Sequence, residues 1–318
     1  TGMEADYKAD ALLNNFKETD YVTASYGDLA KSIIAISLLG ENPKDFNKTN
    51  LVEILENRVQ EDGTLTNDVN GGCGATIWTL MALETVNSPK VKAVADKLST
   101  MAMDNGAYWY EYQGQNANLD TTGWAMEALS VAGRSTYKAA ISKAYTFVQS
   151  KLNSTDGYYD NWGGNADTQS CVLEGLSVAG YPLDTNAYNY LLSYQNEDGT
   201  FNALNYSTSQ LEPNAYASVE GARAVGVINN GSFVLKARKD YTKTTTPVVT
   251  EPETPTTPSV KPETPTTPAV KPETTTTEPK KETVKVVNTG DNTNVMAYVV
   301  AAIAAVGVIV LVIKSKKK

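Results

Sequence analysis

The stretch "GWAMEALSVAG" at residues 123–133 decides the fold, because it returns at residues 170–180 as "SCVLEGLSVAG". Related segments end at Gly40, Asn87 and Gly226, so five copies follow one another at steps of 46 or 47 residues. Self-similarity at a fixed period of this length indicates a repeat architecture, in which each copy is one supersecondary unit.

Each copy contains two different helical segments. The first is apolar nearly all round and closes on Gly, which favours a helix buried on every side that ends in a left-handed residue. The second is amphipathic. In residues 88–101 the helical i, i+3, i+4, i+7 spacing is followed by Val91, Val94, Ala95 and Leu98.

A turn joins each amphipathic helix to the next apolar one. Asp-Gly or Asn-Gly pairs mark these turns at 62–63, 105–106, 156–157 and 198–199, and such pairs supply a positive φ. Buried helices that alternate with half-buried helices imply two concentric layers. We therefore predict an all-α domain over residues 1–233, an α/α toroid of about five helical hairpins.

The segment "LLSYQNEDGTF" at residues 191–201 carries a resemblance to a known repeat. Gln195, Gly199 and Phe201 resemble the Gln-x3-Gly-x-Trp repeat of squalene and oxidosqualene cyclases, with Phe in place of Trp. Residues 1–230 as a whole resemble the prenyltransferase/terpenoid-cyclase superfamily of α/α toroids. That superfamily also includes complement thioester domains and cobalamin carriers, so the resemblance implies the fold more strongly than an activity.

Composition excludes several kinds of chemistry. The chain has no histidine and a net charge of −9, so a Ser-His-Asp triad and a His-ligated zinc site are excluded. The zinc-dependent prenyltransferase activity within the superfamily is excluded for the same reason. We expect no metal and no cofactor, and the acidic balance without a basic stripe indicates no nucleic-acid partner.

Asp120 is the residue that a cyclase activity would use. Class II terpene cyclases carry Asp-x-Asp-Asp and protonate their substrate with the middle Asp, but Asn118 and Thr121 replace the two acidic partners here. The pattern also recurs at Asp167, whereas a catalytic acid is needed once and a helix cap in every repeat. We predict that Asp120 caps its helix.

The two cysteines give weaker signals. Cys73 lies in "GGCGAT", which resembles the Gly-Cys-Gly-Glu-Gln thioester motif of complement proteins, but Ala75 and Thr76 replace the Glu and the Gln that supplies the acyl carbon. We therefore expect no thioester. The sequence leaves open whether Cys73 pairs with Cys171.

Three glutamates interrupt the apolar helices at one repeat position. Glu127, Glu174 and Glu220 each lie six residues before the Gly of their copy, and a buried carboxylate is costly unless it is partnered. They either accept hydrogen bonds from an adjacent hairpin or form a polar ring that lines the lumen and contacts a ligand.

Aromatic residues gather in the loops that precede the apolar helices, so they should meet at one mouth of the barrel. Aromatic rings beside Asp and Asn suit sugars or large planar ligands, although packing of each turn on the next hairpin is the alternative. The predicted ligand-binding residues are Tyr108, Trp109, Tyr110, Trp124, Glu127, Tyr158, Trp162, Glu174, Tyr216 and Glu220.

The C-terminal part has the order of a surface anchor. Residues 234–287 are dominated by Thr, Pro, Glu, Lys and Val, which predicts a disordered, extended stalk. Residues 288–318 contain Thr289-Gly290, a nineteen-residue apolar span at 295–313 and a basic end. That span is just long enough to cross a bilayer as one transmembrane helix.

Thr-Gly, an apolar span and a basic tail resemble the sortase sorting signal of Gram-positive bacteria, whose pattern is Leu-Pro-any-Thr-Gly. Thr289 and Gly290 match, and Val286 and Val287 stand in place of Leu and Pro. The alternative is a plain membrane anchor. Either arrangement implies an extracellular body, and so a signal peptide upstream of Thr1. The expected partners are sortase, peptidoglycan and the membrane.

Together these features predict a cell-surface-anchored, non-catalytic module that binds a glycan, a peptide or a cobalamin-like ligand at the barrel mouth. The alternatives are a terpenoid-cyclase-like isomerase and an adhesive or structural spacer.

Overall fold

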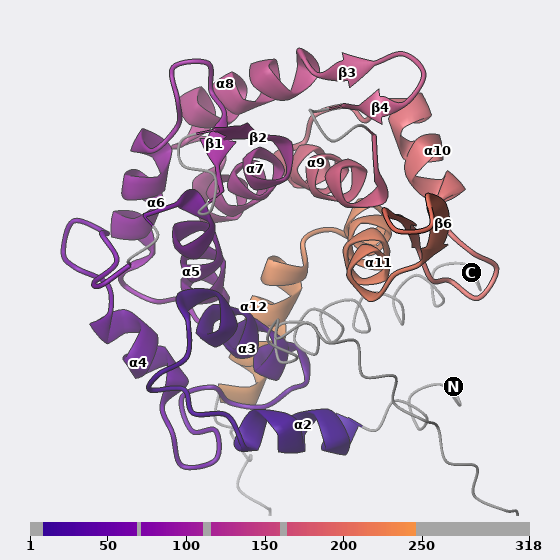
Figure 1. Ribbon diagram of the computed structural model, residues 1–318. Coiled ribbons are helices and arrows are strands. Elements are labelled where there is room, and N and C mark those ends of the chain that lie inside the picture. Colours follow the sequence, from indigo (N-terminus) through magenta and orange to yellow (C-terminus); the bar gives the residue numbers. More distant parts are fainter. Residues whose placement is uncertain (1–8, 69–70, 111–115, 160–163, 246–318) are drawn as a thin grey trace, which may run out of the picture. The chain divides into compact units, whose positions relative to one another are not determined.

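A computed structural model describes residues 9–68, 71–110, 116–159 and 164–245, and this part of the chain is mostly helical, as predicted (Figure 1). All of its elements belong to one compact unit. The long helices α3 (Tyr26–Leu38), α5 (Cys73–Thr85), α7 (Leu119–Gly133), α9 (Ala166–Ala179) and α11 (Ala215–Asn230) are the five apolar segments of the repeat. Each packs on the next in chain order.

A second set of helices lies outside the first (Figure 1). It consists of α4 (Leu51–Asn57), α6 (Val91–Thr100), α8 (Lys138–Gln149) and α10 (Thr185–Ser193), and α2 (Ala9–Lys17) precedes the first repeat. α4, α6 and α8 each contact the inner helix before them and the one after them. The alternation of inner and outer helices therefore follows the sequence period.

Burial of the two sets matches the two sequence patterns. All thirteen residues of α5 are buried, which confirms that a helix apolar on every side is covered on every side. Outer helix α6 buries Val94, Ala95 and Leu98, three of the four residues that define its predicted apolar face.

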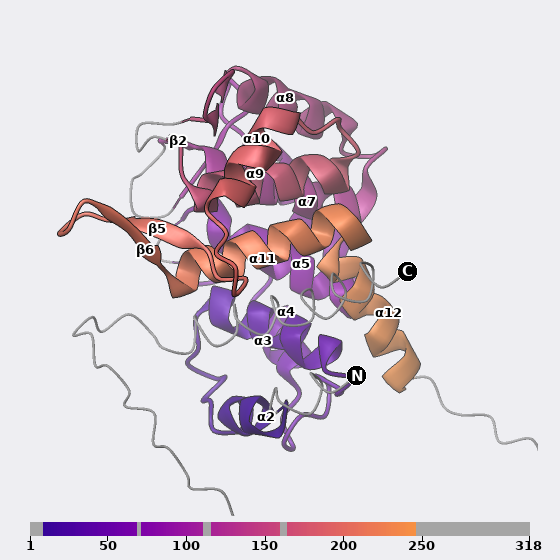
Figure 2. The ribbon, with the colours of Figure 1, turned by 90° about the vertical axis from the view of Figure 1, so that its right-hand side faces the viewer.

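The turns before the inner helices have the predicted backbone. Gly63, Gly106, Gly157 and Gly199 all have φ between +72° and +89°, a region that costs a glycine little. Three of these connections continue into two-stranded antiparallel sheets: β1 (Tyr108–Trp109) with β2 (Ala117–Asn118), β3 (Leu152–Asn153) with β4 (Gly157–Tyr158), and β5 (Asn202–Asn205) with β6 (Gln210–Pro213). Hairpin β5–β6 projects from the helices beside the start of α11 (Figure 2). We call the end at which the inner helices begin the mouth.

The ends of α3, α5 and α9 follow the repeat, whereas α7 includes its Gly133 and is capped by Arg134 in the right-handed conformation. Gly180 caps α9 in the left-handed conformation, and Asn87 after α5 has φ +51°, so Asn takes the role of Gly in that copy. In the last copy the helix continues past Gly226 to Asn230. The expectation that Gly226 ends its helix was therefore wrong.

Helix α12 (Phe233–Thr245) extends the folded part beyond the predicted boundary at residue 233. It contacts α3 and α5, and Phe233, Val234, Ala237 and Tyr241 are its buried residues. Figure 1 shows it inside the outer layer, between α11 and the first two inner helices. Helix α12 thus links the last repeat to the first ones.

None of the helices in the described ranges is long and apolar enough to cross a bilayer. The predicted span at 295–313, Thr289, Gly290 and the stalk lie outside the described residues.

Candidate functional site

The three predicted glutamates are buried and lie on three successive inner helices, Glu127 on α7, Glu174 on α9 and Glu220 on α11. Arg223 connects two of them. Its Nε donates to Glu174 at 3.0 Å from Oε1 and 2.9 Å from Oε2, and its Nη2 donates to Glu220 Oε2. The guanidinium therefore ties α11 to α9.

Glu127 is held from another direction. Ser232, just before α12, donates its hydroxyl to Glu127 Oε1 at 3.0 Å. Burial, and then the negative charge of Glu174, raise the pKa of Glu127 well above its ordinary value. Burial and the charge of Glu174 thus both favour the neutral form of the Glu127 carboxyl group.

Arg223 remains a cation although burial works against its charge, because attraction to Glu174 and Glu220 raises its pKa. A buried carboxylate is tolerated when it is paired and hydrogen-bonded. The geometry thus favours the structural reading of Glu174 and Glu220, in which each side chain bonds a neighbouring group of the fold.

Trp78 on α5 brings four other elements together. Its ring meets Trp124 of α7 edge-on with a centroid separation of 5.7 Å, and Phe233 of α12 lies 6.4 Å away. Two cations approach the same ring, Lys31 Nζ at 4.7 Å and the Arg223 guanidinium carbon at 5.9 Å. Trp124, a predicted ligand contact, is buried in this aromatic group.

The prediction that Asp120 caps its helix was wrong. The N-cap of α7 is Asn118, whose Oδ1 accepts from the Thr121 amide at 2.7 Å. Asn165 and Asn214 cap α9 and α11 in the same way. Asn is as good an N-cap as Asp, and in these three copies it stands where the extended backbone ends.

Asp120 and Asp167 instead occupy the first turns of α7 and α9. Burial raises the pKa of Asp167 to about 7, and the charges of Glu220 and Asp120 add to the shift. A carboxyl group with this pKa exchanges a proton near neutral pH. Asp167 is thus suited to acid–base chemistry at the mouth.

Two of the predicted aromatic contacts belong to the core. Tyr108 and Tyr158 are fully buried, and Gln149 Nε2 donates to the Tyr158 hydroxyl at 3.2 Å. Their rings pack each turn on the next hairpin, which is the alternative that the sequence left open. Trp109 and Tyr110 are half-buried, and Trp162 lies outside the described residues.

The exposed apolar residues gather elsewhere on the mouth. Seven large hydrophobic side chains are exposed in the described part, and four of them lie on hairpin β5–β6 or at the start of α11: Leu204 (47%), Tyr206 (76%), Leu211 (54%) and Tyr216 (40%). We call these four residues the hairpin patch. Leu204 and Leu211 are direct cross-strand partners, so their side chains share one face of the sheet.

The cysteines are both free and both buried. Burial raises the pKa of the Cys73 thiol to about 12, which makes it a poor nucleophile at neutral pH. In the described ranges no three His, Cys, Asp or Glu side chains are grouped so that they could hold a metal ion.

Sequence reasoning found the glutamates but missed Arg223 and Ser232. A signal for Arg223 is present in "VEGARAVG", where a second charge follows Glu220 by three residues on an apolar helix. Nothing local marks Ser232, because its partner Glu127 is 105 residues away.

Comparison with known proteins adds no assignment: no protein-family model matches the chain, and a search of curated proteins found no match.

Proposed function

We propose that residues 9–245 form an α/α toroid of the prenyltransferase/terpenoid-cyclase type that serves as a non-catalytic binding module at the cell surface. The ordered contacts from α3 to α11 and the outer helices between them support this fold. The inner side chains Glu174, Glu127 and Trp124 each contact another residue of the fold, namely Arg223, Ser232 and Trp78. These contacts support a structural role for the interior.

The hairpin patch carries the functional part of the proposal. A group of exposed apolar side chains is typical of an interaction surface, and Tyr is enriched in protein interfaces. Because two of the four residues are leucines, which suit a peptide better than a sugar, we assign a protein or extended peptide as the partner. A glycan and a cobalamin-like molecule are the competing ligands.

The test uses the full chain in detergent and a Leu204→Ser/Leu211→Ser variant. Panning of a random peptide library should enrich peptides whose affinity falls at least about tenfold in the variant, as expected when interface leucines are removed. Leu235→Ser is the matched control, because Leu235 is 40% exposed but lies on α12. Figure 2 shows α12 at the opposite end of α11 from the hairpin.

A glycan array and native mass spectrometry with cobalamins form the other arms. Retention of a glycan or cobalamin with unchanged affinity in the Leu204→Ser/Leu211→Ser variant would overturn the peptide assignment. Failure of every probe to bind would favour the structural spacer.

Surface display is the second part of the proposal. Thr289-Gly290, the apolar span at 295–313 and the basic end support cleavage by a sortase and attachment to peptidoglycan. In a Gram-positive host with sortase, the chain should be released from purified walls by muramidase and should end at Thr289 by mass spectrometry. Recovery from membranes with the span intact would instead establish a plain anchor.

The isomerase alternative is favoured by one observation, the raised pKa of Asp167 beside Asp120 and Glu220. It requires turnover of a polyprenyl or epoxide substrate that is abolished by Asp167→Asn. Turnover of squalene or oxidosqualene by the intact chain, absent in that variant, would replace the binding proposal.

A further inference from the structure

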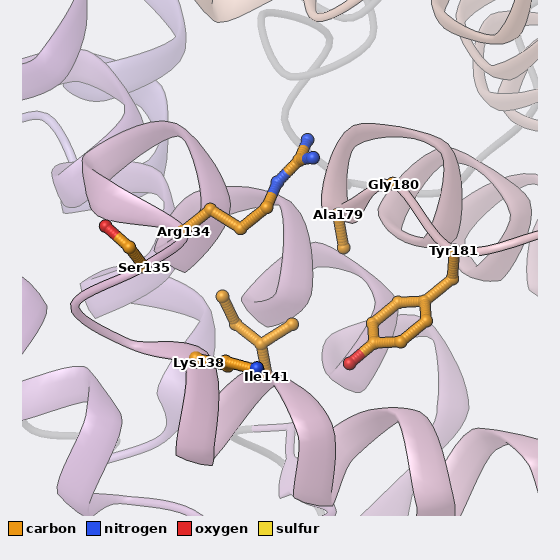
Figure 3. Close-up of a pocket in the computed structure, with 7 residues that line it drawn as sticks. All are labelled: Arg134, Ser135, Lys138, Ile141, Ala179, Gly180 and Tyr181. Atoms are coloured by element: carbon orange, nitrogen blue, oxygen red, sulfur yellow. The ribbon is translucent and has the colours of Figure 1, made fainter.

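A pocket of about 520 Å³ opens between the junction of α7 with α8 and the end of α9 (Figure 3). Its walls come from residues 134–135, the first turns of α8 and residues 179–181. None of the predicted ligand-binding residues lines it. The pocket also lies at the end of the inner helices opposite the mouth, since α7 and α9 finish beside it.

The charged residues of the lining are Arg134 and Lys138, and no carboxylate lines the pocket. Neither cation forms an ion pair with any described residue. Arg134 donates through Nη2 to the backbone carbonyl of Val178. A guanidinium has five N–H donors in a planar fork, so others remain for a ligand. The pocket is thus a cationic site on a chain of net charge −9.

The position of Arg134 depends on a glycine. Gly180 has φ +75°, and a Cβ at this residue would lie 2.5 Å from Arg134 Nη1. Because glycine has no side chain, the Arg134 guanidinium can reach the end of α9 at this position. Figure 3 shows Arg134 extended toward Gly180 across the pocket from Tyr181.

The aromatic wall is fixed in the same way. The Tyr181 ring stacks on Tyr145 at a centroid separation of 3.8 Å and an interplanar angle of 4°. Its hydroxyl lies 3.2 Å from Ser142 Oγ. Because Tyr145 covers one face of the Tyr181 ring, only the other face and the edge of the ring can contact a ligand. The buried side chain of Ile141 also lines the pocket.

We propose that this pocket binds an acidic sugar, with the anionic group held by Arg134 and Lys138 and the sugar ring against Ile141 and Tyr181. Its volume falls within the range of about 300–1,000 Å³ that small-molecule sites occupy, and it is larger than an inorganic anion needs. Arg presents a fork that matches carboxylate or phosphate oxygens. The site is independent of the hairpin patch, and each can fail without the other.

The experiment titrates the full chain in detergent with glucuronate, glucose 6-phosphate, glucose and inorganic phosphate, by calorimetry and ligand-observed NMR. The two acidic sugars should bind at least about tenfold more tightly than glucose, as expected for a charge-assisted contact. Comparing them distinguishes a carboxylate from a phosphate as the preferred group. Their affinity should fall as salt is raised from low to physiological concentration.

Variants locate the site. Arg134→Gln/Lys138→Gln should lose at least about tenfold in affinity, while Lys143→Gln, an exposed cation on the same helix outside the pocket, should lose none. Gly180→Ala should also weaken binding without changing the net charge, because it displaces Arg134. Should the double variant fail to fold, Lys138→Gln alone carries the test, since Lys138 is exposed.

Three results would overturn the proposal: glucose binding as tightly as glucuronate, no binding of either acidic sugar, or unchanged affinity in a folded Arg134→Gln/Lys138→Gln or Lys138→Gln variant.

Discussion

Arg223 on α11 binds the carboxylate of Glu174 on α9 with Nε 2.9 Å from Oε2, and both side chains are almost wholly buried. The same guanidinium binds Glu220 one turn earlier on its own helix. The buried guanidinium is therefore held by hydrogen bonds from Nε and Nη2 to two carboxylates on different helices. The last repeat is thereby fixed to the one before it by charge as well as by apolar packing.

Arg223→Met should destabilise the protein by about 3–5 kcal/mol, because it leaves two buried carboxylates without their cation. Urea denaturation near pH 7.5 measures the loss. The loss should be smaller near pH 5, where Glu174, whose pKa is raised by burial, can take up a proton instead.

The matched control is Arg223→Met/Glu174→Gln/Glu220→Gln, which removes the charges together and should recover a large part of the lost free energy. If Arg223→Met alone were neutral at pH 7.5, the buried ion network would not stabilise the fold as inferred.

Stability should fall as the pH rises from 5 to 8. Burial raises the folded-state pKa of Asp167 to about 7, well above the ordinary value of an aspartate, so the folded state binds a proton that the unfolded state has lost. Its stabilising contribution is full below the unfolded pKa and disappears as the pH rises through about 7. The pKa of Glu127 is shifted in the same direction by burial and by Glu174.

The expected decrease attributable to Asp167 is about 2–3 kcal/mol between these pH values. Chemical denaturation at several pH values measures it, and Asp167→Asn should flatten much of the slope. A free energy of unfolding that increases from pH 5 to pH 8 would contradict the proton assignment.

The sequence predicted the repeat because its signals are local. The spacing of Val94, Ala95 and Leu98, and the glycines of the Asp-Gly turns, depend on helix geometry and on φ alone. Both therefore appear in the structure where the sequence puts them.

The interior could not be predicted in the same way, because its partners are distant along the chain. Helix α12 follows the repeats and mixes Phe233, Val234 and Ala237 with Lys and Arg, so its composition resembles a surface segment more than a core helix. Its burial depends on Trp78, more than 150 residues earlier. The burial of Tyr108 was left open for a related reason, since a loop position by itself suggests exposure.

Asn118→Ala should destabilise the protein by about 0.5–2 kcal/mol, because it removes the side-chain acceptor for the Thr121 amide. Asp120→Asn should cost clearly less, since Asp120 is not the cap. Thermal denaturation of the two variants at one pH compares them. A larger loss from Asp120→Asn than from Asn118→Ala would restore the cap to Asp120.

Two glycines determine how closely α7 and α9 pack. A Cβ on Gly123 would lie 2.2 Å from the Cys171 carbonyl oxygen, and a Cβ on Gly175 would lie 2.2 Å from the Gly123 carbonyl oxygen. These obstacles are backbone atoms, which cannot rotate away as a side chain can. Each glycine thus permits one helix to approach the other at that level.

Gly123→Ala and Gly175→Ala should each destabilise the protein by at least about 1–3 kcal/mol, since the added methyl group must push two inner helices apart. Gly27→Ala is the control, because Gly27 is also helical and a Cβ there meets only Ser25 Oγ, at 3.8 Å. That change should be neutral or stabilising by up to about 1 kcal/mol, because Ala is the better helix former. Urea denaturation measures the free energy of unfolding of the three variants. Equal changes in all three would show that helix propensity, and not close packing, determines the effect of Ala at these positions.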